Sequence, residues 1–430
     1  MTVQPSSTAA AETSVLPASL RAHAKYLLNV YARPPLMFTH GEGCYLYEES
    51  GRRYLDFTAG IAVNALGHAD PGVAEVVAQQ ARELVHTSNL YHHPHSGHLA
   101  EMLVEGSNAV RPGTFGKVFF SNSGTEANEA ALKLARKWGK TQSAGKKTST
   151  KTGVVAFSGA FHGRSMGALS ATATEKYRLP FEPLVPGFRH ETFDDIKAVN
   201  KAITEDTCAV LVEPMQGEGG INIASEPFLR ALRKRCDEVN ALLIYDEIQC
   251  GLGRTGKLWA HHHYADDCVP DVLTSAKPLA NGIPIGAMLT SDRAASCLGL
   301  GEHGTTFGGA PLPTRVGVHV VGRINTPEFL DNVTRVGNQL RKGLEDVCVA
   351  FPELVAEVRG VGLLIGVEFR QDPSRFVKLC MERGLLLVAA GRQTVRVVPP
   401  LTVGETEIAE GTRIWREALE ALDKERVASA

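Results

Sequence analysis

The sequence predicts an α/β fold built around a parallel sheet with helices on both of its faces. Between residues 117 and 290, short runs of almost wholly apolar residues alternate with segments of helical spacing. A strand that is apolar throughout has both faces buried, and a helix between successive strands returns the chain to the same edge of the sheet. The expected strands are Lys117–Phe120, Val154–Phe157, Cys208–Val212, Ala241–Tyr245, Val272–Ser275 and Gly286–Leu289, and the expected helices among them are Thr125–Trp138 and Pro227–Asn240.

The two ends of the chain show a different pattern. Residues 43–56 alternate in polarity on either side of Glu49-Ser50-Gly51, which predicts a β-hairpin, and residues 71–84 have helical spacing. A long helical pattern over residues 324–349 is followed by short apolar strands and by a helix near residues 373–383. These features predict a smaller α+β domain with antiparallel strands beside the large sheet.

The composition is that of a soluble globular protein with two or three domains. The 430 residues are 43% hydrophobic and 21% charged, and 45 Lys and Arg nearly balance 47 Asp and Glu. This balance excludes a strong field for nucleic acid or an anionic membrane, and no run of eighteen apolar residues occurs to span a bilayer. The eight cysteines include no CxxC pair, which indicates reduced thiols. Residues 1–20 read as an unstructured leader, with an organellar transit peptide as the alternative.

One glycine-rich segment imitates a nucleotide site. Gly251-Leu-Gly253-Arg-Thr-Gly256 matches the dinucleotide-binding pattern, and Asp271 follows at a suitable distance. Phosphate binding there requires a long helix after the third glycine. The segment that follows Gly256 is instead rich in histidine, and Pro270 would interrupt any helix in it. Neighbouring histidines point to different faces of a regular element, so His261-His262-His263 predicts a surface loop and no metal site.

A lysine directly follows one of the apolar strands. Lys277 stands between Val272–Ser275 and a loop rich in proline and glycine. A lysine in this position can be desolvated, which lowers its pKa and makes the amine a nucleophile. An ordinary surface lysine is the alternative interpretation.

Two carboxylates end the neighbouring strand Ala241–Tyr245. Asp246 and Glu247 therefore lie at the carboxyl edge of the sheet, where α/β folds bind ligands. A carboxylate there needs a cation, and a protonated pyridine nitrogen whose ring acts as an electron sink is one candidate. A metal ion or a helix cap remains as the alternative, and the metal is disfavoured because no second carboxylate or histidine cluster is evident.

A turn between a strand and a helix offers an anion site. Gly124 gives the turn its freedom, and either Ser123 or Thr125 can cap the helix that follows. The amides and hydroxyls of the same turn can bind a phosphate. Capping alone explains the hydroxyls about as well.

Four further residues are candidate ligand contacts. Phe161 follows a strand and can stack on a planar cofactor. Arg164 and Arg396 can each bind a carboxylate with two hydrogen bonds, and Glu218 could neutralise a guanidinium when no carboxylate is bound. Taken singly, each charged residue is as well explained by a surface ion pair.

Together these motifs resemble those of the class III, fold-type I aminotransferases, over residues 25–425. The motifs are SNSGTEANEAALKLAR, FHGR, EPMQGEGG, DEIQCGLGRTGK, SAKPLANGIPIGA and HGTTFGG, in family order. The resemblance implies pyridoxal 5′-phosphate and no metal, a large, mostly parallel seven-stranded sheet domain, and a smaller α+β domain formed by both chain ends. We expect the leader at 1–20, the N-terminal part of the small domain at 21–85, the large cofactor-binding domain at 86–323 and the C-terminal small domain at 324–430.

The resemblance also implies a role for each candidate residue. Lys277 would hold the cofactor as a Schiff base, and Asp246 would pair with the pyridine nitrogen. Gln249 would lie near the ring hydroxyl, and Phe161 against the ring face. Ser123, Gly124 and Thr125 would bind the phosphate, with Thr306 reaching it from the neighbouring subunit of a homodimer whose active site lies at the interface.

Within the class, the sequence most resembles the acetylornithine aminotransferases, particularly the fungal ones. Three segments carry this similarity: YARPPLMFTHGEGCYLY, YLDFTAGIAVNALGHADP and LVHTSNLY. Related ornithine δ-aminotransferases usually have an aromatic near Gly60-Ile61 and a tryptophan where His162 stands. Two positions depart from the family pattern, because Ala310 and Ala280 stand where asparagine and glycine are usual.

This resemblance implies a reaction in arginine biosynthesis. The δ-amino group of N2-acetylornithine would pass to 2-oxoglutarate and form glutamate. Arg164 and Thr305 would contact the donor's carboxylate side, and Arg396 with Glu218 would form the switch that admits 2-oxoglutarate. Ornithine or 4-aminobutyrate aminotransferase is the alternative within the class, and a non-catalytic homologue that binds the cofactor is the alternative outside it. The expected compartment is the mitochondrial matrix, with the cytoplasm as the alternative.

Overall fold

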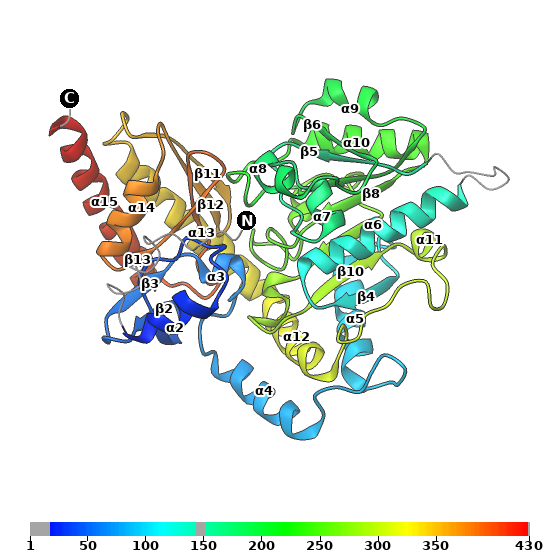
Figure 1. Cartoon of the computed structure of the whole chain (residues 1–430), viewed down its shortest axis with the longest axis horizontal. Coiled ribbons are helices and arrows are strands. Elements are labelled where there is room, and N and C mark those ends of the chain that lie inside the picture. Colours follow the sequence, from blue (N-terminus) through cyan, green and yellow to red (C-terminus); the bar gives the residue numbers. More distant parts are fainter. Residues whose placement is uncertain (1–17, 143–150, 429–430) are drawn as a thin grey trace, which may run out of the picture.

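The chain forms two groups of elements that lie side by side (Figure 1). The computed structural model describes residues 18–142 and 151–428; residues 1–17, 143–150 and 429–430 lie outside the description. One group, coloured cyan to yellow, is built on the large sheet. The other joins the blue N-terminal elements to the orange and red C-terminal ones.

The large sheet has seven strands in the order β4-β10-β9-β8-β7-β5-β6. Their bounds are β4 (Lys117–Ser121), β5 (Gly153–Phe157), β6 (Phe188–Glu191), β7 (Thr207–Val212), β8 (Leu242–Asp246), β9 (Val272–Ser275) and β10 (Gly286–Thr290). Strands β6, β5, β7, β8 and β9 pair in parallel, while β10 runs antiparallel to both β9 and β4. The predicted mostly parallel, seven-stranded sheet is therefore confirmed. Strand β6 was not expected because its sequence, FRHE, is polar and only partly buried.

Both faces of the sheet are covered, as the apolar strands predicted. Helix α6 (Gly124–Thr141) covers one face and α10 (Glu226–Val239) the other. Along β8, Leu242 and Ile244 pack in one hydrophobic cluster with α6, whereas Leu243 and Tyr245 pack in a second cluster with α10. Alternate residues of a strand point to opposite faces, so a run of five buried residues is what a doubly covered strand requires.

The second group contains two four-stranded sheets. One has the order β1-β2-β3-β13 and the other β11-β12-β15-β14. Their strands are β1 (Phe38–Glu42), β2 (Tyr45–Glu48), β3 (Arg53–Asp56), β11 (Val355–Val361), β12 (Leu364–Phe369), β13 (Leu385–Leu386), β14 (Val388–Ala390) and β15 (Thr394–Val397). Strands β2 and β3 form the predicted hairpin, and β13 pairs in parallel with β3. This pairing joins the two ends of the chain in one sheet.

The remaining helices connect and cover these sheets. They are α2 (Ala18–Tyr26), α3 (Ala59–Ala62), α4 (Pro71–Glu83), α5 (Pro94–Asn108), α7 (Met166–Ala171), α8 (Glu175–Arg178), α9 (Ile196–Ala202), α11 (Asp292–Ala295), α12 (Pro311–Ile324), α13 (Pro327–Cys348), α14 (Ser374–Glu382) and α15 (Glu405–Ala428), with the 3₁₀ turns η1 (Leu179–Phe181), η2 (Ala260–His263) and η3 (Lys277–Ala280). Within the described ranges, no helix is both long and apolar enough to cross a membrane.

Two expectations about helices need correction. The unstructured leader was placed at residues 1–20, but α2 already begins at Ala18; the rest of that leader lies outside the described residues. The helical pattern from residue 324 to residue 349 starts with a break: α12 ends at Ile324, and Thr326 caps α13 by accepting a hydrogen bond from the Phe329 amide. Pro327 favours the first turn of a new helix, because proline lacks the amide that an interior position must donate.

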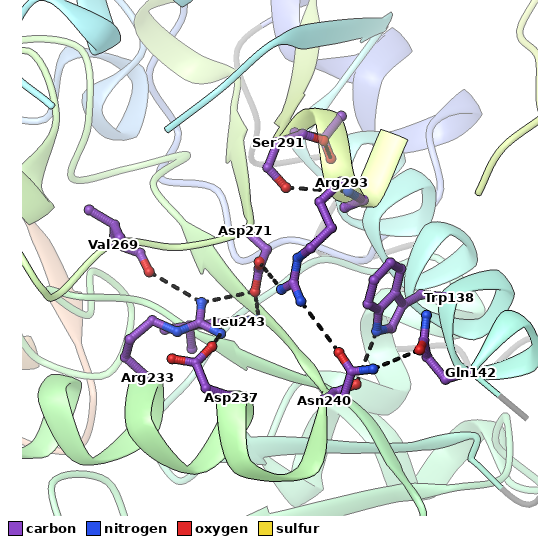
Figure 2. Close-up of polar contacts among 12 residues, drawn as sticks. Trp138, Gln142, Arg233, Asp237, Asn240, Leu243, Val269, Asp271, Ser291 and Arg293 are labelled. Carbon is purple, nitrogen blue, oxygen red and sulfur yellow. Dashed lines mark hydrogen bonds and ion pairs between the residues drawn. The ribbon is translucent and has the colours of Figure 1, made fainter. Parts of the chain in front are cut away.

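An ion-pair network closes the amino edge of the large sheet (Figure 2). Asp271 precedes β9 and is 7% exposed; its carboxylate accepts from Arg233 of α10 at 2.9 Å and from Arg293 of α11 at 2.5 Å. It also accepts from the Leu243 amide of β8 at 2.9 Å. Asp271 therefore fastens two helices to the edge of the sheet opposite Lys277. This geometry does not support Asp271 as the acidic residue of a dinucleotide-binding site.

We predict that Asp271→Asn lowers the free energy of unfolding by about 3 kcal/mol, because it leaves the buried Arg233 guanidinium without its main counter-ion. This loss of stability is at the low end of the range expected for breaking a buried ion pair, because Asp237 still contacts Arg233 at 2.6 Å. Denaturant titration measures the change. Asp346→Asn is the matched control, because Asp346 pairs with Lys342 on the surface and should cost about 1 kcal/mol or less. Equal effects of the two substitutions would contradict the prediction.

Candidate active site

A pocket of about 370 Å³ opens at the carboxyl edge of the large sheet. It lies where β5, β7, β8 and β9 end, which is the edge at which α/β sheets bind ligands. The predicted residues that line it are Ser123, Gly124, Thr125, Phe161, Arg164, Asp246, Gln249 and Lys277. Four segments far apart in the sequence therefore contribute predicted residues to one cavity.

Strand β9 ends at Ser275, and Ala276 connects it to Lys277, the first residue of the turn η3. Burial and the nearby charge of Arg396 lower the pKa of its amine from 10.5 to about 8, while Glu213, Asp246 and Glu218 oppose the shift. An amine with a pKa near 8 is about half neutral at pH 8 and about one-tenth neutral at pH 7, far more than an ordinary lysine. Lys277 is consequently able to act as a nucleophile or a base.

Asp246 is held by a network of buried groups. It ends β8 and is 3% exposed. Its Oδ2 accepts from Asn128 Nδ2 at 2.8 Å and lies 2.8 Å from His162 Nδ1, while its Oδ1 accepts from the Ile248 amide at 3.1 Å. Asn128 is fixed in turn by the hydroxyl of Thr274, which donates to its Oδ1 at 2.8 Å. The carboxylate thus has a single orientation, toward the pocket.

The turn before α6 supplies the N-terminus of an 18-residue helix. Ser123 caps it by accepting a hydrogen bond from the Glu126 amide at 3.3 Å. Thr125 Oγ1 contacts Ser165 Oγ at 2.7 Å, so its hydroxyl also ties the turn to the loop that precedes α7. The first amides of a helix and its dipole favour an anion, and here they face the pocket. Gly124 is required for close packing, because a Cβ there would lie 2.8 Å from Ile248.

Aromatic and cationic groups gather at the mouth of the pocket. Phe161 and Tyr177 meet edge to face, with ring centroids 6.2 Å apart. The guanidinium of Arg164 lies 3.7 Å from the Tyr177 ring centroid and 5.5 Å from that of Phe161. Arg164 is therefore oriented by stacking and keeps its hydrogen-bond donors for a ligand. Tyr177 was not anticipated from the sequence, because it belongs to the short helix α8, which carries no motif.

Arg396 belongs to strand β15; neither it nor Glu218 lines the pocket, but Arg396 contacts Gln249, which does. Arg396 is fully buried and donates to Glu218 Oε2 at 3.0 Å and to Gln249 Oε1 at 2.8 Å. Burial lowers the pKa of Arg396, and the Glu218 carboxylate opposes this shift. The predicted Arg396–Glu218 pair is present. Gln249, expected near a ring hydroxyl, lines the pocket and also holds Arg396.

Two threonines lie farther away. Thr305 Oγ1 accepts from Asn122 Nδ2 at 3.2 Å, next to the α6 turn, but Thr305 does not line the pocket. Thr306 is exposed and lies beside a separate small hollow with His86 and Asn89. The structure of this one chain does not bring Thr306 to the pocket.

The histidine-rich segment corrects another expectation. His261 belongs to η2 and is fully buried, with Nδ1 2.6 Å from Glu247 Oε1. The prediction of a surface loop was wrong because Glu247 faces inward and needs partners; the amide of His261 also donates to it at 2.9 Å. Among the described residues, no group of three or more His, Cys, Asp or Glu is placed to hold a metal.

The glycine-rich segment Gly251–Gly256 is a buried connection between the two groups of elements. Arg254, in its centre, donates to the carbonyls of Leu363 and Pro399 at 3.1 and 2.5 Å. No long helix follows it, as the sequence indicated. The segment therefore fixes the C-terminal strands, including Arg396, against the large sheet.

The pocket fits a phosphorylated pyridine aldehyde. Lys277 offers an amine for the aldehyde, the buried Asp246 offers a fixed carboxylate for a protonated ring nitrogen, and the N-terminus of α6 offers amides for the phosphate. His162 Nδ1 and Asn128 Nδ2 both contact Oδ2 of Asp246 and fix the orientation of its carboxylate. The combination of an amine, a carboxylate and the amides of a helix N-terminus matches the three functional groups of such a molecule.

Comparison with known proteins agrees with this chemistry. The chain belongs to the class-III aminotransferases, whose family model matches residues 28–419. The mitochondrial acetylornithine aminotransferase of Neurospora crassa is 48% identical over 94% of this chain and 87% of its own length. That of Yarrowia lipolytica is 49% identical over 92% of this chain and 94% of its own length.

Two solved structures show the same architecture. The N-acetylornithine aminotransferase of Stenotrophomonas maltophilia is 34% identical, with a TM-score of 0.79 over 95% of this chain and all of its own. The ornithine aminotransferase of Toxoplasma gondii is 30% identical, with a TM-score of 0.88 over 98% of this chain and all of its own. Because both substrate classes share the fold, the substrate must be argued from the site.

Proposed function

We propose that the protein is a pyridoxal-5′-phosphate-dependent aminotransferase that moves the δ-amino group of N2-acetylornithine to 2-oxoglutarate and forms glutamate, as in arginine biosynthesis. The observation that carries the proposal is the placement of Lys277 and Asp246 in one pocket, at the ends of the adjacent strands β9 and β8. Relatives that are 48 and 49% identical and named acetylornithine aminotransferases support the choice of donor.

The chain's own groups would hold the cofactor. Lys277 would bind its aldehyde carbon, Asp246 would accept a hydrogen bond from its ring nitrogen, and the turn Ser123–Thr125 would bind its phosphate, with Phe161 against the ring. When bound, the cofactor supplies a ring that accepts the electron pair left when a proton is removed from the carbon bearing the transferred amine.

Lys277 would move that proton. Its Nζ, once released, takes a proton from Cδ of N2-acetylornithine and later returns one to the cofactor side, acting as base and then as acid. A pKa lowered to about 8 by burial suits both steps, since the amine and the ammonium forms are both well populated at mildly basic pH. Asp246 would keep the ring nitrogen protonated throughout.

Arg164 and Arg396 would bind carboxylates in the two half-reactions. Arg164, stacked on Tyr177, would bind the carboxylate side of the donor together with Thr305. Arg396 would bind one carboxylate of 2-oxoglutarate after Glu218 swings away, and Glu218 would neutralise it again when the donor returns. Glu218 is free to move, since its side chain is 33% exposed while that of Arg396 is 1% exposed.

We predict that Arg396→Ala raises the KM for 2-oxoglutarate by about 10- to 100-fold, the loss of two charge-assisted hydrogen bonds at a buried site. The half-reaction with N2-acetylornithine should change less, because Arg396 is paired with Glu218 at that stage. Single-turnover measurements with each substrate check the difference. The surface variant Arg413→Ala should leave both half-reactions unchanged, and an equal loss in both would contradict the switch.

A comparison of three amino donors identifies the substrate. With 2-oxoglutarate as acceptor, kcat/KM for N2-acetylornithine should exceed the values for ornithine and 4-aminobutyrate by at least about tenfold, the discrimination expected from a few unmatched contacts. Ornithine aminotransferases usually carry an aromatic near Gly60-Ile61 and a tryptophan where His162 stands, and the absence of both from this chain favours a substrate whose α-amine is masked. A preference for ornithine or 4-aminobutyrate would replace the substrate assignment. A colourless protein that is inactive with all three would indicate a non-catalytic homologue.

We also propose that the active form is a homodimer, in which Thr306 of one subunit reaches the cofactor phosphate of the other. Large apolar side chains are exposed in several segments, among them Leu28 at 83%, Leu90 at 85%, Tyr91 at 69% and Phe307 at 63%. Exposed apolar groups in such number mark an association surface. Light scattering should give twice the chain mass of 46.2 kDa; a monomer would exclude a site at a subunit interface.

We place the protein in the mitochondrial matrix, with the cytoplasm as the alternative, on the names of its relatives. Fusion of a fluorescent protein to the C-terminus tests this placement. Diffuse cytoplasmic fluorescence would overturn it.

A further inference from the structure

Glu213 is a buried carboxylate of the pocket to which the reaction above gives no role. It directly follows β7, is 5% exposed and lines the pocket with Lys277 and Asp246. A carboxylate buried this deeply costs free energy unless hydrogen bonds or charges compensate it. The groups that compensate it therefore indicate what it does.

The two oxygens of Glu213 bind two different loops. Oε1 accepts a hydrogen bond from the Phe161 amide at 3.0 Å, and Oε2 accepts one from the Gly217 amide at 3.0 Å. Phe161 lies in the loop after β5 and lines the pocket. Gly217 directly precedes Glu218, the partner of Arg396. One side chain thus links the loop of the ring-face aromatic to the loop of the carboxylate switch.

Neither loop has regular structure at the point where Glu213 holds it. Loops depend on side-chain partners to satisfy and fix their amides, because they lack the ladder bonds of helices and strands. Other contacts support the Glu218 loop from its far side, such as the hydrogen bond from the Gly391 amide to the Glu218 carbonyl at 2.7 Å. Gln216 also joins the two loops, by donating from Nε2 to the Ser158 carbonyl at 2.7 Å, but it does not line the pocket. Glu213 joins them from inside the pocket.

We propose that Glu213 is a positioning residue that couples the cofactor-stacking loop to the carboxylate switch. This inference rests on the proposed aminotransferase function. Its ionised carboxylate keeps Phe161 at the ring face and Glu218 in reach of Arg396 at the same time. A single Glu213 oxygen serves each loop, so any change that converts one oxygen from an acceptor into a donor releases one of them.

The charge environment makes this clamp sensitive to pH. Burial and the nearby Asp246 carboxylate raise the pKa of Glu213 from 4.5 to about 7, while His162 and the two amides oppose the shift. The titratable groups that face Glu213 are Asp246, His162, Lys277, Arg396 and Cys250. Because the pKa is raised, the clamp is present above pH 7 and is lost as the pH falls through 7.

Glu213→Gln tests the clamp with little change of shape. The amide oxygen of glutamine can still accept from one loop, but its NH₂ group faces the amide of the other. With the cofactor saturating, the KM for 2-oxoglutarate or the dissociation constant of the cofactor should rise by about 10-fold or more, the loss expected for a hydrogen bond to a charged group, with kcat nearly kept. Glu213→Asp keeps the charge, but its shorter side chain cannot reach both loops, so it should show the same rise. It replaces the glutamine variant as the test if that variant does not fold.

Glu129→Gln is the matched control. Glu129 also accepts from two backbone amides, those of Gly167 and Ala168 at 2.8 and 3.1 Å, but both bind the same oxygen, Oε1. The amide oxygen of glutamine can keep both bonds, and Glu129 does not line the pocket. This variant should leave KM, kcat and cofactor affinity unchanged.

The pH dependence separates positioning from a structural role. For whichever of the two constants rises, the KM for 2-oxoglutarate or the dissociation constant of the cofactor, the ratio of variant to wild type should fall toward one between pH 8 and pH 6, because the wild type loses its own clamp in that range. A ratio independent of pH, or a fall in kcat with both KM and cofactor affinity unchanged, would overturn the proposal. If the wild type itself turned over neither N2-acetylornithine nor ornithine with 2-oxoglutarate, the proposed function would fail instead.

Discussion

Lys277→Ala is expected to lower turnover by about 10⁴-fold or more, since it removes both the covalent attachment of the cofactor and the base that moves the proton. The side chain projects from η3 into the pocket, so the alanine variant should fold and its cofactor-free form should unfold at nearly the wild-type temperature. Steady-state production of glutamate from N2-acetylornithine and 2-oxoglutarate measures the effect.

Lys257→Ala supplies the control for that experiment. Lys257 is exposed, and it lies in the turn that follows the glycine-rich segment, outside the pocket. Its removal should leave turnover within the error of the assay. Sustained multiple turnover by the Lys277 variant would show that another group performs the proton transfer.

Asp246→Asn should lower kcat in both half-reactions by about 10²- to 10³-fold, the usual effect of removing one preorganised electrostatic group from an active site. The asparagine can accept from Asn128 or from the Ile248 amide, but it carries no charge to keep a ring nitrogen protonated. Rapid-mixing kinetics with N2-acetylornithine and with 2-oxoglutarate would report both losses.

The pattern of losses distinguishes Asp246 from the carboxylate-binding residues. Asp246 would act on the ring in both directions, whereas Arg396 would bind only one substrate, so Asp246→Asn should change kcat and Arg396→Ala should change KM. Asp246→Glu keeps the charge and should recover part of the rate. Loss of one half-reaction alone in the Asp246 variant would be inconsistent with a ring-nitrogen partner.

The fold and the centre of the site follow from local sequence. Apolar runs ending in Asp246 and at Lys277 identify strands and also place both side chains at the carboxyl edge of the sheet, which the structure shows. The turn Ser123–Thr125 is recognisable because a capping residue and a glycine precede a strong helical pattern. In each case the information lies within a few residues of the feature predicted.

The supporting residues could not be found in this way. His162 and Asn128 reach Asp246 across 84 and 118 residues of sequence, and Glu213 reaches Phe161 across 52. Hydrogen bonds between distant segments leave no periodic pattern. A weak signal existed for Glu213, since it ends an apolar strand as Asp246 does. The buried His261 was misjudged for a similar reason, because its partner Glu247 is 14 residues earlier.

The central claim, that Lys277 holds the cofactor, is tested most directly by reducing the pyridoxal-5′-phosphate-loaded protein with borohydride and mapping its peptides by mass spectrometry. Reduction fixes the cofactor to the amine that binds it. The account predicts a phosphopyridoxyl group on the peptide that contains Lys277, and its absence when N2-acetylornithine has first converted the cofactor to its amine form. Labelling of another lysine, or of none, would contradict it.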